Sequence, residues 1–222
     1  MSCAICHTRR EKRFCPALHD RICPQCCGTE REVSLDCPST CEYLQQARRH
    51  ERPRDLAELE QGALFPNVEV RQEFVYRREP FIVGLTFAIT NAARADRSLN
   101  DRDAIAALTA LAKSYETLVG SGLVYDSPTT SLAQQNIAAE IQKMLTEYRA
   151  VEQKNLGYST LKDSEVLEAL VFIIRMAHAR TSGRPRSRAF LDFLFAQFPD
   201  RGSAVVTPDQ APPKLRGRLV IP

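Results

Sequence analysis

The chain has 222 residues, of which 44% are apolar and 26% are charged, with a formal net charge of +3. This composition supports an ordinary globular core and suits one domain of moderate size plus a small one. The N-terminus lacks the pattern of a secretion signal, and no apolar run approaches the roughly 20 residues that span a bilayer, so we expect a cytoplasmic protein without membrane segments.

Cysteines are confined to the beginning of the chain. Eight occur within the first 41 residues and none occurs after them, namely Cys3, Cys6, Cys15, Cys23, Cys26, Cys27, Cys37 and Cys41. A short segment so rich in charged residues cannot form a packed apolar core, and in a reducing compartment its thiols favour metal or redox chemistry. A disulfide framework is the alternative for an even number of cysteines, but it requires a secretion signal.

Two of the cysteine pairs have the two-residue gap that lets both thiols reach one zinc ion. They are Cys3–Cys6 and Cys23–Cys26. In the second pair we expect Pro24 to fix the turn and Gly28 to let backbone N–H groups point at sulfur. This spacing predicts a tetrahedral metal site built on knuckle-like turns.

The last two cysteines are four residues apart, in the stretch Cys37–Cys41. Pro38 suits the first turn of a helix, and the residues up to Arg49 continue a helical pattern. We therefore expect both thiols on one face at the start of a helix, where the helix dipole stabilises thiolate.

Two turn-borne pairs followed by a helix resemble the treble-clef and cross-brace zinc fingers, such as the RING, B-box, FYVE, MYND and HIT-type modules. The stretch Arg13–Pro16 is similar to the HIT-type pattern in particular. The resemblance covers residues 3 to about 50. The chain departs from these patterns in its Cys26–Cys27 doublet and in lacking a closing downstream pair, so the resemblance implies two interleaved metal sites and no activity.

In an interleaved scheme two Zn²⁺ ions share the eight thiols. The first ion takes Cys3, Cys6, Cys23 and Cys26, and the second takes Cys15, Cys27, Cys37 and Cys41. His19, His7 or His50 could replace a cysteine, most simply Cys27. An iron–sulfur cluster is the functional alternative, although the ferredoxin-type run of cysteines is absent. All-cysteine zinc sites are seldom hydrolytic, so we expect a structural role.

The charge of this region changes once metal is included. Residues 1–54 hold ten Arg and Lys against seven Asp and Glu, whereas residues 55–222 hold twenty of each. Eight thiolates with two Zn²⁺ ions carry a combined charge of −4, which turns the local +3 into about −1. The basic residues are therefore weak grounds for predicting nucleic-acid binding.

Residues 55–199 predict an all-α bundle of five to seven helices, preceded by a short linking helix near residues 54–61. Residues 66–79 fit a strand or a helix, with Pro80 as a break. Apolar stripes at helical spacing follow in Phe81–Ala92, Ile105–Val119, Ile137–Val151, Val166–Met176 and Phe190–Phe198. The fourth is apolar nearly all round, which predicts a central helix beginning at Thr160 or Asp163. The proline-rich tail, residues 200–222, is predicted to be disordered, with Lys214–Ile221 as either a short interaction peptide or a frayed end.

No catalytic or nucleotide-binding motif occurs in the helical body. Its strongest local charge is a run of five arginines without an acid, Arg175, Arg180, Arg184, Arg186 and Arg188. This run is a candidate polyanion-binding segment, and a solvated helix end is the plainer interpretation.

These observations predict a zinc-binding intracellular adaptor or regulator whose partner is most simply another protein, and they favour no catalysis. One alternative is a nucleic-acid-associated factor that uses Arg175–Arg188 with the basic residues near Arg9–Arg13. The other alternative is an enzyme, either an iron–sulfur redox protein or a RING-like ligase.

Overall fold

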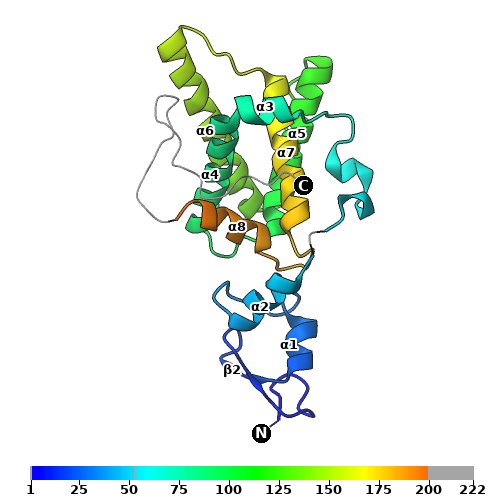
Figure 1. The fold of residues 1–222 in the computed structure, drawn as a ribbon. Helices are drawn as coiled ribbons and strands as arrows, with labels where there is room; N and C mark the ends of the chain where they lie inside the picture. Colours follow the sequence, from blue (N-terminus) through cyan, green and yellow to red (C-terminus); the bar gives the residue numbers. More distant parts are fainter. Residues whose placement is uncertain (1, 53, 200–222) are drawn as a thin grey trace.

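The computed structural model describes residues 2–52 and 54–199, which form a small N-terminal module beneath a larger helical body (Figure 1). The described part is mainly helical, as predicted, with eight α-helices and one two-stranded sheet. None of these helices is long and apolar enough to cross a membrane. The proline-rich tail predicted over residues 200–222 lies outside the described residues.

The N-terminal module, residues 2–52, is built on a short hairpin and two helices. Strands β1 (Arg13–Cys15) and β2 (Asp20–Ile22) pair antiparallel, and the helices are α1 (Pro24–Glu30) and α2 (Glu42–His50). Its buried cluster consists mostly of cysteines, joined by two larger apolar side chains, Ile22 and Leu35. So little apolar area cannot offset the conformational entropy of ordering about 50 residues, and the module needs a further source of stability.

The chain between the module and the body forms short turns. Two 3₁₀ turns, η1 (Leu56–Glu58) and η2 (Gln61–Leu64), stand where a linking helix was predicted, and both pack on α7. The ambiguous stretch that follows contains a helix, α3 (Gln72–Arg77). Pro80 falls in the first turn of the next helix, where its missing N–H breaks no helical hydrogen bond.

The body consists of α4 (Glu79–Ala95), α5 (Asp101–Ser121), α6 (Leu132–Leu156), α7 (Asp163–Arg180) and α8 (Ala189–Gln197). Helix α7 packs along α5, α4 packs along α6, and α8 closes the end of the body that faces the module (Figure 1). The prediction of a central helix is confirmed, because α7 is buried along nearly its whole length.

Local signals set the ends of the long helices. Asn100 and Asp103 form a capping box at the start of α5, and Gly122, with φ 73°, ends that helix in the left-handed region. Ser131 caps α6, and Gly157, with φ 82°, ends it. The caps precede and the glycines follow the apolar stripes Ile105–Val119 and Ile137–Val151, so each helix is longer than its stripe and ends at a local signal in the sequence.

A buried ionic network ties α4, α6 and α7 together. Arg78 donates to a Glu165 carboxylate oxygen at 2.7 Å and to the carbonyl oxygen of Thr160 at 3.0 Å. Glu152 accepts from the Thr160 hydroxyl at 2.7 Å and from the backbone N–H of Leu161 at 3.1 Å. The network fixes the turn between α6 and α7, because the Glu152 carboxylate holds the backbone that leads into α7.

Asp101 joins α5 to α8. Its carboxylate is fully buried and accepts from the Ser187 hydroxyl at 2.7 Å and from the backbone N–H groups of Phe190 and Leu191 at 3.2 Å each. Burial raises the pKa of Asp101, while the hydrogen bonds from Ser187 and the α8 backbone act in the opposite direction. The residue thereby caps α8 from the neighbouring helix.

Candidate metal centre

Four cysteines of the module converge on one point. The sulfur atoms of Cys3, Cys6, Cys23 and Cys26 all lie within 4.8 Å of one another. Three of these side chains are buried and Cys6 is half-buried, and all four are free thiols. Four thiols within this distance can act as the ligands of a single tetrahedral metal ion.

Two turns place these thiols. Near the N-terminus, the backbone N–H of His7 donates to the carbonyl oxygen of Cys3 at 2.9 Å, and His7 has a left-handed φ of 54°. In the second turn Cys23 is the N-cap of α1, and the N–H of Cys26 donates to the Cys23 sulfur at 3.4 Å. The N–H of Cys23 donates in turn to the Cys3 sulfur at 3.2 Å, so backbone donors link the two turns through sulfur.

Gly28 does not have the role predicted for it. It lies inside α1 with a helical φ and has no atom within 4 Å of the position of an added Cβ. Backbone N–H groups that reach the sulfurs come from Cys23 and Cys26, and in the first turn from Thr8 and Arg9. The start of α1 supplies the N–H of Cys26, because the first N–H groups of a helix have no partner within it.

The thiols differ in acidity. A hydrogen bond from the Thr8 side chain and backbone N–H groups of Arg9 and Thr8 lower the pKa of Cys6 to about 5. The backbone N–H of Cys26 lowers the pKa of Cys23, whereas hydrogen bonding to Cys23 and burial raise the pKa of Cys26 to about 12. Four sulfurs this close cannot all be ionised unless a cation lies among them, which is the requirement that a metal ion fulfils.

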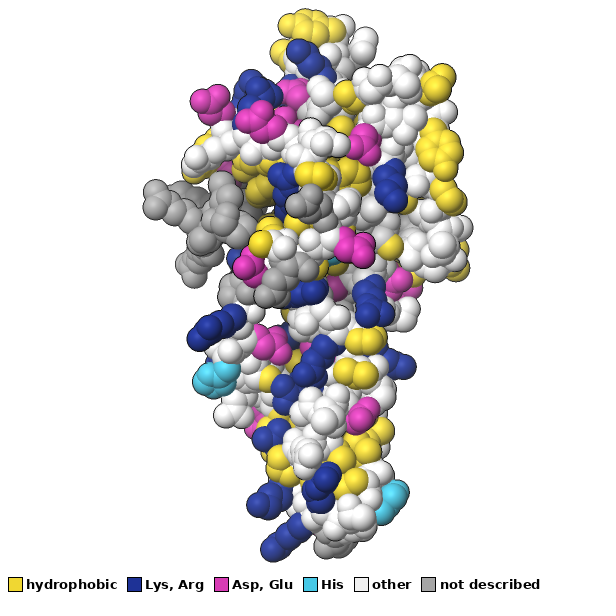
Figure 2. Space-filling model, turned by 90° about the vertical axis from the view of Figure 1, so that its right-hand side faces the viewer, with side chains coloured by type: hydrophobic (Ala, Val, Ile, Leu, Met, Phe, Trp, Pro, Cys, Tyr) yellow, Lys and Arg dark blue, Asp and Glu magenta, His cyan; other side chains and the backbone are white. Residues whose placement is uncertain are grey.

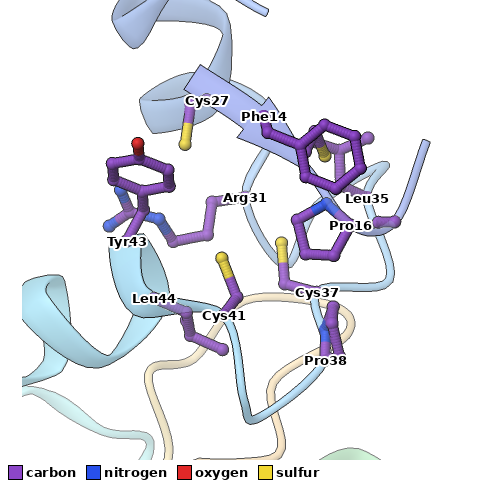
Figure 3. Close-up of a pocket in the computed structure, with 12 residues that line it drawn as sticks. Phe14, Pro16, Cys27, Arg31, Leu35, Cys37, Pro38, Cys41, Tyr43 and Leu44 are labelled. Carbon is purple, nitrogen blue, oxygen red and sulfur yellow. The ribbon is translucent and has the colours of Figure 1, made fainter. Parts of the chain in front are cut away.

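The remaining four cysteines line one small cavity. Cys15, Cys27, Cys37 and Cys41 share it with Tyr43 and Leu44 of α2 and with neighbouring prolines, and its volume is about 10 Å³. Figure 3 shows the sulfurs of Cys27, Cys37 and Cys41 pointing toward one another across this cavity. Within the described residues, the sulfur atoms of the first set come together most closely, within 4.8 Å of one another, and the second set is looser.

Cys37 and Cys41 reach this cavity by a route other than the predicted one. Helix α2 begins at Glu42 with Cys41 as its N-cap, so neither cysteine lies within the helix. A turn in which the N–H of Cys41 donates to the carbonyl oxygen of Pro38 at 2.9 Å folds the segment back. The prediction of one shared helical face is wrong, because Pro38 shapes a turn before the helix and not its first turn.

The three histidines considered as substitutes lie elsewhere. His7, His19 and His50 are exposed, and none of them lines the cavity of the second set. His19 has a left-handed φ of 52° in the turn between β1 and β2. Among the described residues, neither the cluster of the first four cysteines nor the cavity lined by the other four includes a histidine.

Most of the predicted polyanion-binding arginines have internal partners. Arg175 donates to the carbonyl oxygens of Leu64, Phe65 and Val68 at 2.8–3.0 Å. Arg180 stacks over the Phe193 ring at 4.2 Å, and Arg188 donates to the carbonyl oxygen of Arg97.

Arg184 donates to two carbonyl oxygens of the module, while the Arg186 side chain is exposed. Four of the five guanidinium groups therefore make contacts within the fold. Polyanion binding by this segment stays a prediction.

Sequence reasoning missed the residues that join the module to the body. Glu32 is 1% exposed and accepts from Arg48 at 2.8 Å and from the Ser182 hydroxyl at 3.0 Å. Asp192 of α8 accepts from the Ser39 hydroxyl at 2.6 Å and also from Arg48. No local pattern marks these residues, since their partners lie far away in the chain.

The surface of the module is predominantly basic on one side. Figure 2 shows Lys and Arg side chains following the module from the body to its far end, with hydrophobic and a few acidic side chains between them. Part of this charge lies at the cysteine cluster, since hydrogen bonding of Arg9 to Cys23 raises the pKa of that arginine.

Fold and site together define a mainly helical protein with an N-terminal cysteine-rich module, in which four clustered thiols are placed to hold a metal ion. No known protein family, curated protein or solved structure matches this chain.

Proposed function

We propose that the module binds two zinc ions that shape it as an interaction surface, and that the protein acts as an intracellular adaptor or regulator of other proteins. The observation that carries this proposal is the closed cluster of four cysteine sulfurs within 4.8 Å. Cys15, Cys27, Cys37 and Cys41, gathered around one cavity, would hold the second ion.

Zinc is favoured by the ligand set and by the local backbone. Four thiolates in a tetrahedron suit Zn²⁺, and N–H groups such as that of Cys26 stabilise sulfur charge around the ion. A structural zinc ion contributes roughly 10–16 kcal/mol of apparent binding free energy. That amount exceeds what the small apolar cluster around Ile22 and Leu35 can supply.

A binding role is favoured over catalysis by the same ligands. A catalytic zinc keeps one open position beside three protein ligands, usually with histidine or carboxylate among them. The first set offers four cysteines, and the exposed histidines lie away from the cavity of the second. Such sites hold a fold in shape, and the folded surface then provides the function.

Metal analysis of the full-length protein tests the cofactor directly. We expect two moles of zinc per mole of chain and a colourless protein. One mole or none would contradict the two-ion proposal. A visible absorption band near 400 nm, roughly where thiolate-bound iron clusters absorb, would favour an iron–sulfur protein instead.

The partner class is tested by comparing binding to protein and to nucleic acid with the full chain as bait. We expect a protein partner that is retained by the zinc-loaded chain and lost after chelation. Binding to a random-sequence DNA duplex that weakens steeply with salt would favour the nucleic-acid alternative. Retention of the same partner after zinc removal would contradict a role for the module.

A further inference from the structure

The module is attached to the body through one short region of its chain. In the described residues, the hydrogen bonds between the two parts involve module residues 28–48. Arg184 donates to the carbonyl oxygens of Gly28 at 3.1 Å and of Arg31 at 2.6 Å, and the backbone N–H of Arg186 donates to the carbonyl oxygen of Glu32 at 2.8 Å. The loop that follows α7 therefore holds the turn that follows α1.

Glu32 strengthens this attachment from inside the interface. It adopts a left-handed φ of 53°, which costs a non-glycine residue energy and needs support from its surroundings. The Ser182 hydroxyl and the Arg48 guanidinium provide this support by donating to its buried carboxylate. Arg48 of α2 also donates to the carboxylate of Asp192 in α8. The turn around Glu32, helix α2 and helix α8 therefore form one hydrogen-bonded unit.

The same region carries the second set of cysteines. Cys27 directly precedes Gly28, Cys37 and Cys41 bracket Ser39, and α2 starts immediately after Cys41. The first set is only partly in this region, because Cys23 and Cys26 lie at the start of α1 whereas Cys3 and Cys6 lie on a turn that takes no part in these hydrogen bonds. Figure 1 shows the same division, with α2 beside α8 and β2 toward the far end of the module.

We infer that the metal ion of the second set fastens the module to the body, whereas the ion of the first set stabilises the module alone. This inference rests on the proposed function, because it requires the second ion. Ligation of Cys27, Cys37 and Cys41 restricts the turn between them, and this holds the carbonyl groups of Gly28, Arg31 and Glu32 where Arg184 and Arg186 meet them. Metal binding and docking then favour each other to the same extent, as thermodynamic linkage demands.

The backbone N–H of Arg186 is a built-in reporter of docking, because it donates to the carbonyl oxygen of Glu32 across the interface. Hydrogen exchange of this amide is measured in full-length zinc-loaded protein and in two ligand variants, Cys37→Ser and Cys6→Ser. We expect Cys37→Ser to lose one zinc ion and to exchange at Arg186 at least about tenfold faster. Cys6→Ser is expected to lose one zinc ion with exchange at Arg186 unchanged within about twofold.

The reciprocal effect is measured at Arg184. Arg184→Ala removes both guanidinium contacts to the module, while Arg186→Ala makes the same charge change in the same loop at an exposed side chain. In competition with a chromophoric zinc chelator, Arg184→Ala is expected to bind one of its two zinc ions about tenfold more weakly. Arg186→Ala is expected to bind both as the unmodified chain does.

The outcomes separate the two proposals. A full-length chain that binds fewer than two zinc ions overturns the proposed function, and this inference with it. If Cys37→Ser loses its ion without faster exchange at Arg186, or Arg184→Ala binds both ions normally, the fastening role is wrong and the two-ion module stands. Equal acceleration in Cys6→Ser also overturns the division of roles. Far-UV circular dichroism of each full-length variant checks that the helices of the body, α4 to α8, remain folded.

Discussion

The thiols of the module differ from ordinary core cysteines in what surrounds their sulfur atoms. Cys3 is fully buried, yet its sulfur accepts the backbone N–H of Cys23. An apolar core would leave that N–H without a partner, so the arrangement suits sulfur that carries negative charge. The individual residue therefore already indicates a ligand and not a packing role.

One prediction at this scale concerns which side chains bind metal. Cys6→Ser is expected to reduce the zinc content from two ions to one, because serine is a poor ligand for zinc among thiolates. His7→Ala is the matched control, since this exposed histidine is adjacent in sequence and is not expected to bind. Metal analysis after gel filtration measures both. A loss of zinc in His7→Ala would show that histidine completes a site.

A second prediction concerns the buried carboxylate of Glu152. Burial raises its pKa, but hydrogen bonds from Thr160, Ser159 and the following backbone outweigh burial, so the pKa lies below its usual value of 4.5. The folded state then binds the proton more weakly than the unfolded state does. The resulting stability is complete above about pH 4.5 and is lost as the pH falls through the lower folded-state pKa.

Glu152→Gln is expected to reduce the free energy of unfolding by about 2–3 kcal/mol at neutral pH, because buried donors lose a charged acceptor. Part of the acid sensitivity should disappear with it. Glu147→Gln, at an exposed position of the same helix, is expected to change stability by less than about 0.5 kcal/mol. Urea unfolding at several pH values measures these effects, and equal stability of the two variants would contradict the role given to Glu152.

At the scale of elements, the long helices are bounded by residues that act through local geometry. Gly122 ends α5 with a left-handed φ of 73°, whereas Gly120 lies in the last turn of the helix with no atom within 4 Å of an added Cβ. Helix α4 shows a different use of glycine, since an added Cβ on Gly84 would lie 3.2 Å from the Met144 sulfur of α6. The close approach of α6 to α4 at this point agrees with the small residues, glycine and alanine, on the apolar face of α4.

The pair of glycines at the end of α5 gives a matched test. Gly122→Ala is expected to reduce the free energy of unfolding by about 1 kcal/mol, because alanine is strained in the left-handed region. Gly120→Ala is expected to increase it by up to about 1 kcal/mol, since alanine favours the helix and the space is open. Chemical denaturation measures both. Effects of the same sign would contradict this account of the helix end.

At the scale of the whole molecule, two separate cores are joined by polar contacts. The body has a large apolar cluster centred on α7, and the module has a small one made mostly of cysteines. The contacts between them are hydrogen bonds and ion pairs around Glu32, Arg48 and Asp192. Apolar burial thus holds the body, whereas the module relies on the cysteine clusters that we propose to bind metal.

Removal of metal should therefore separate the two parts. Treatment of the full-length protein with a strong chelator is expected to unfold residues 2–52 while α4 to α8 keep their helical signal. Hydrogen exchange followed by mass spectrometry measures each segment, with readdition of zinc as the control for reversibility. Unfolding of the whole chain on chelation would show instead that the body depends on the module.

Features that are encoded locally could be predicted from the amino-acid sequence. Helical periodicity predicted the mainly helical body and its central helix. The two-residue gaps predicted the pairs Cys3–Cys6 and Cys23–Cys26, because ligands so close in the chain reach one ion almost regardless of the rest of the fold. The convergence of the two pairs was expected from the interleaved scheme and is a contact between segments about 20 residues apart. The four-residue spacing of Cys37 and Cys41 led to the wrong prediction of a shared helical face. A turn before a helix can bring such a pair together just as the first turn of a helix can.

The contacts of the arginines and of Glu32 could not be predicted in this way, because they depend on the packing of the whole chain. Arg175, Arg184 and Arg188 bind backbone carbonyl groups, which every residue possesses, so no residue type in the sequence marks their partners. Ser182 lies 150 residues from Glu32, and their contact exists only because the body and the module meet. Long-range polar contacts depend on the completed packing of both parts, whereas helices and metal-ligand pairs form from neighbours in the chain.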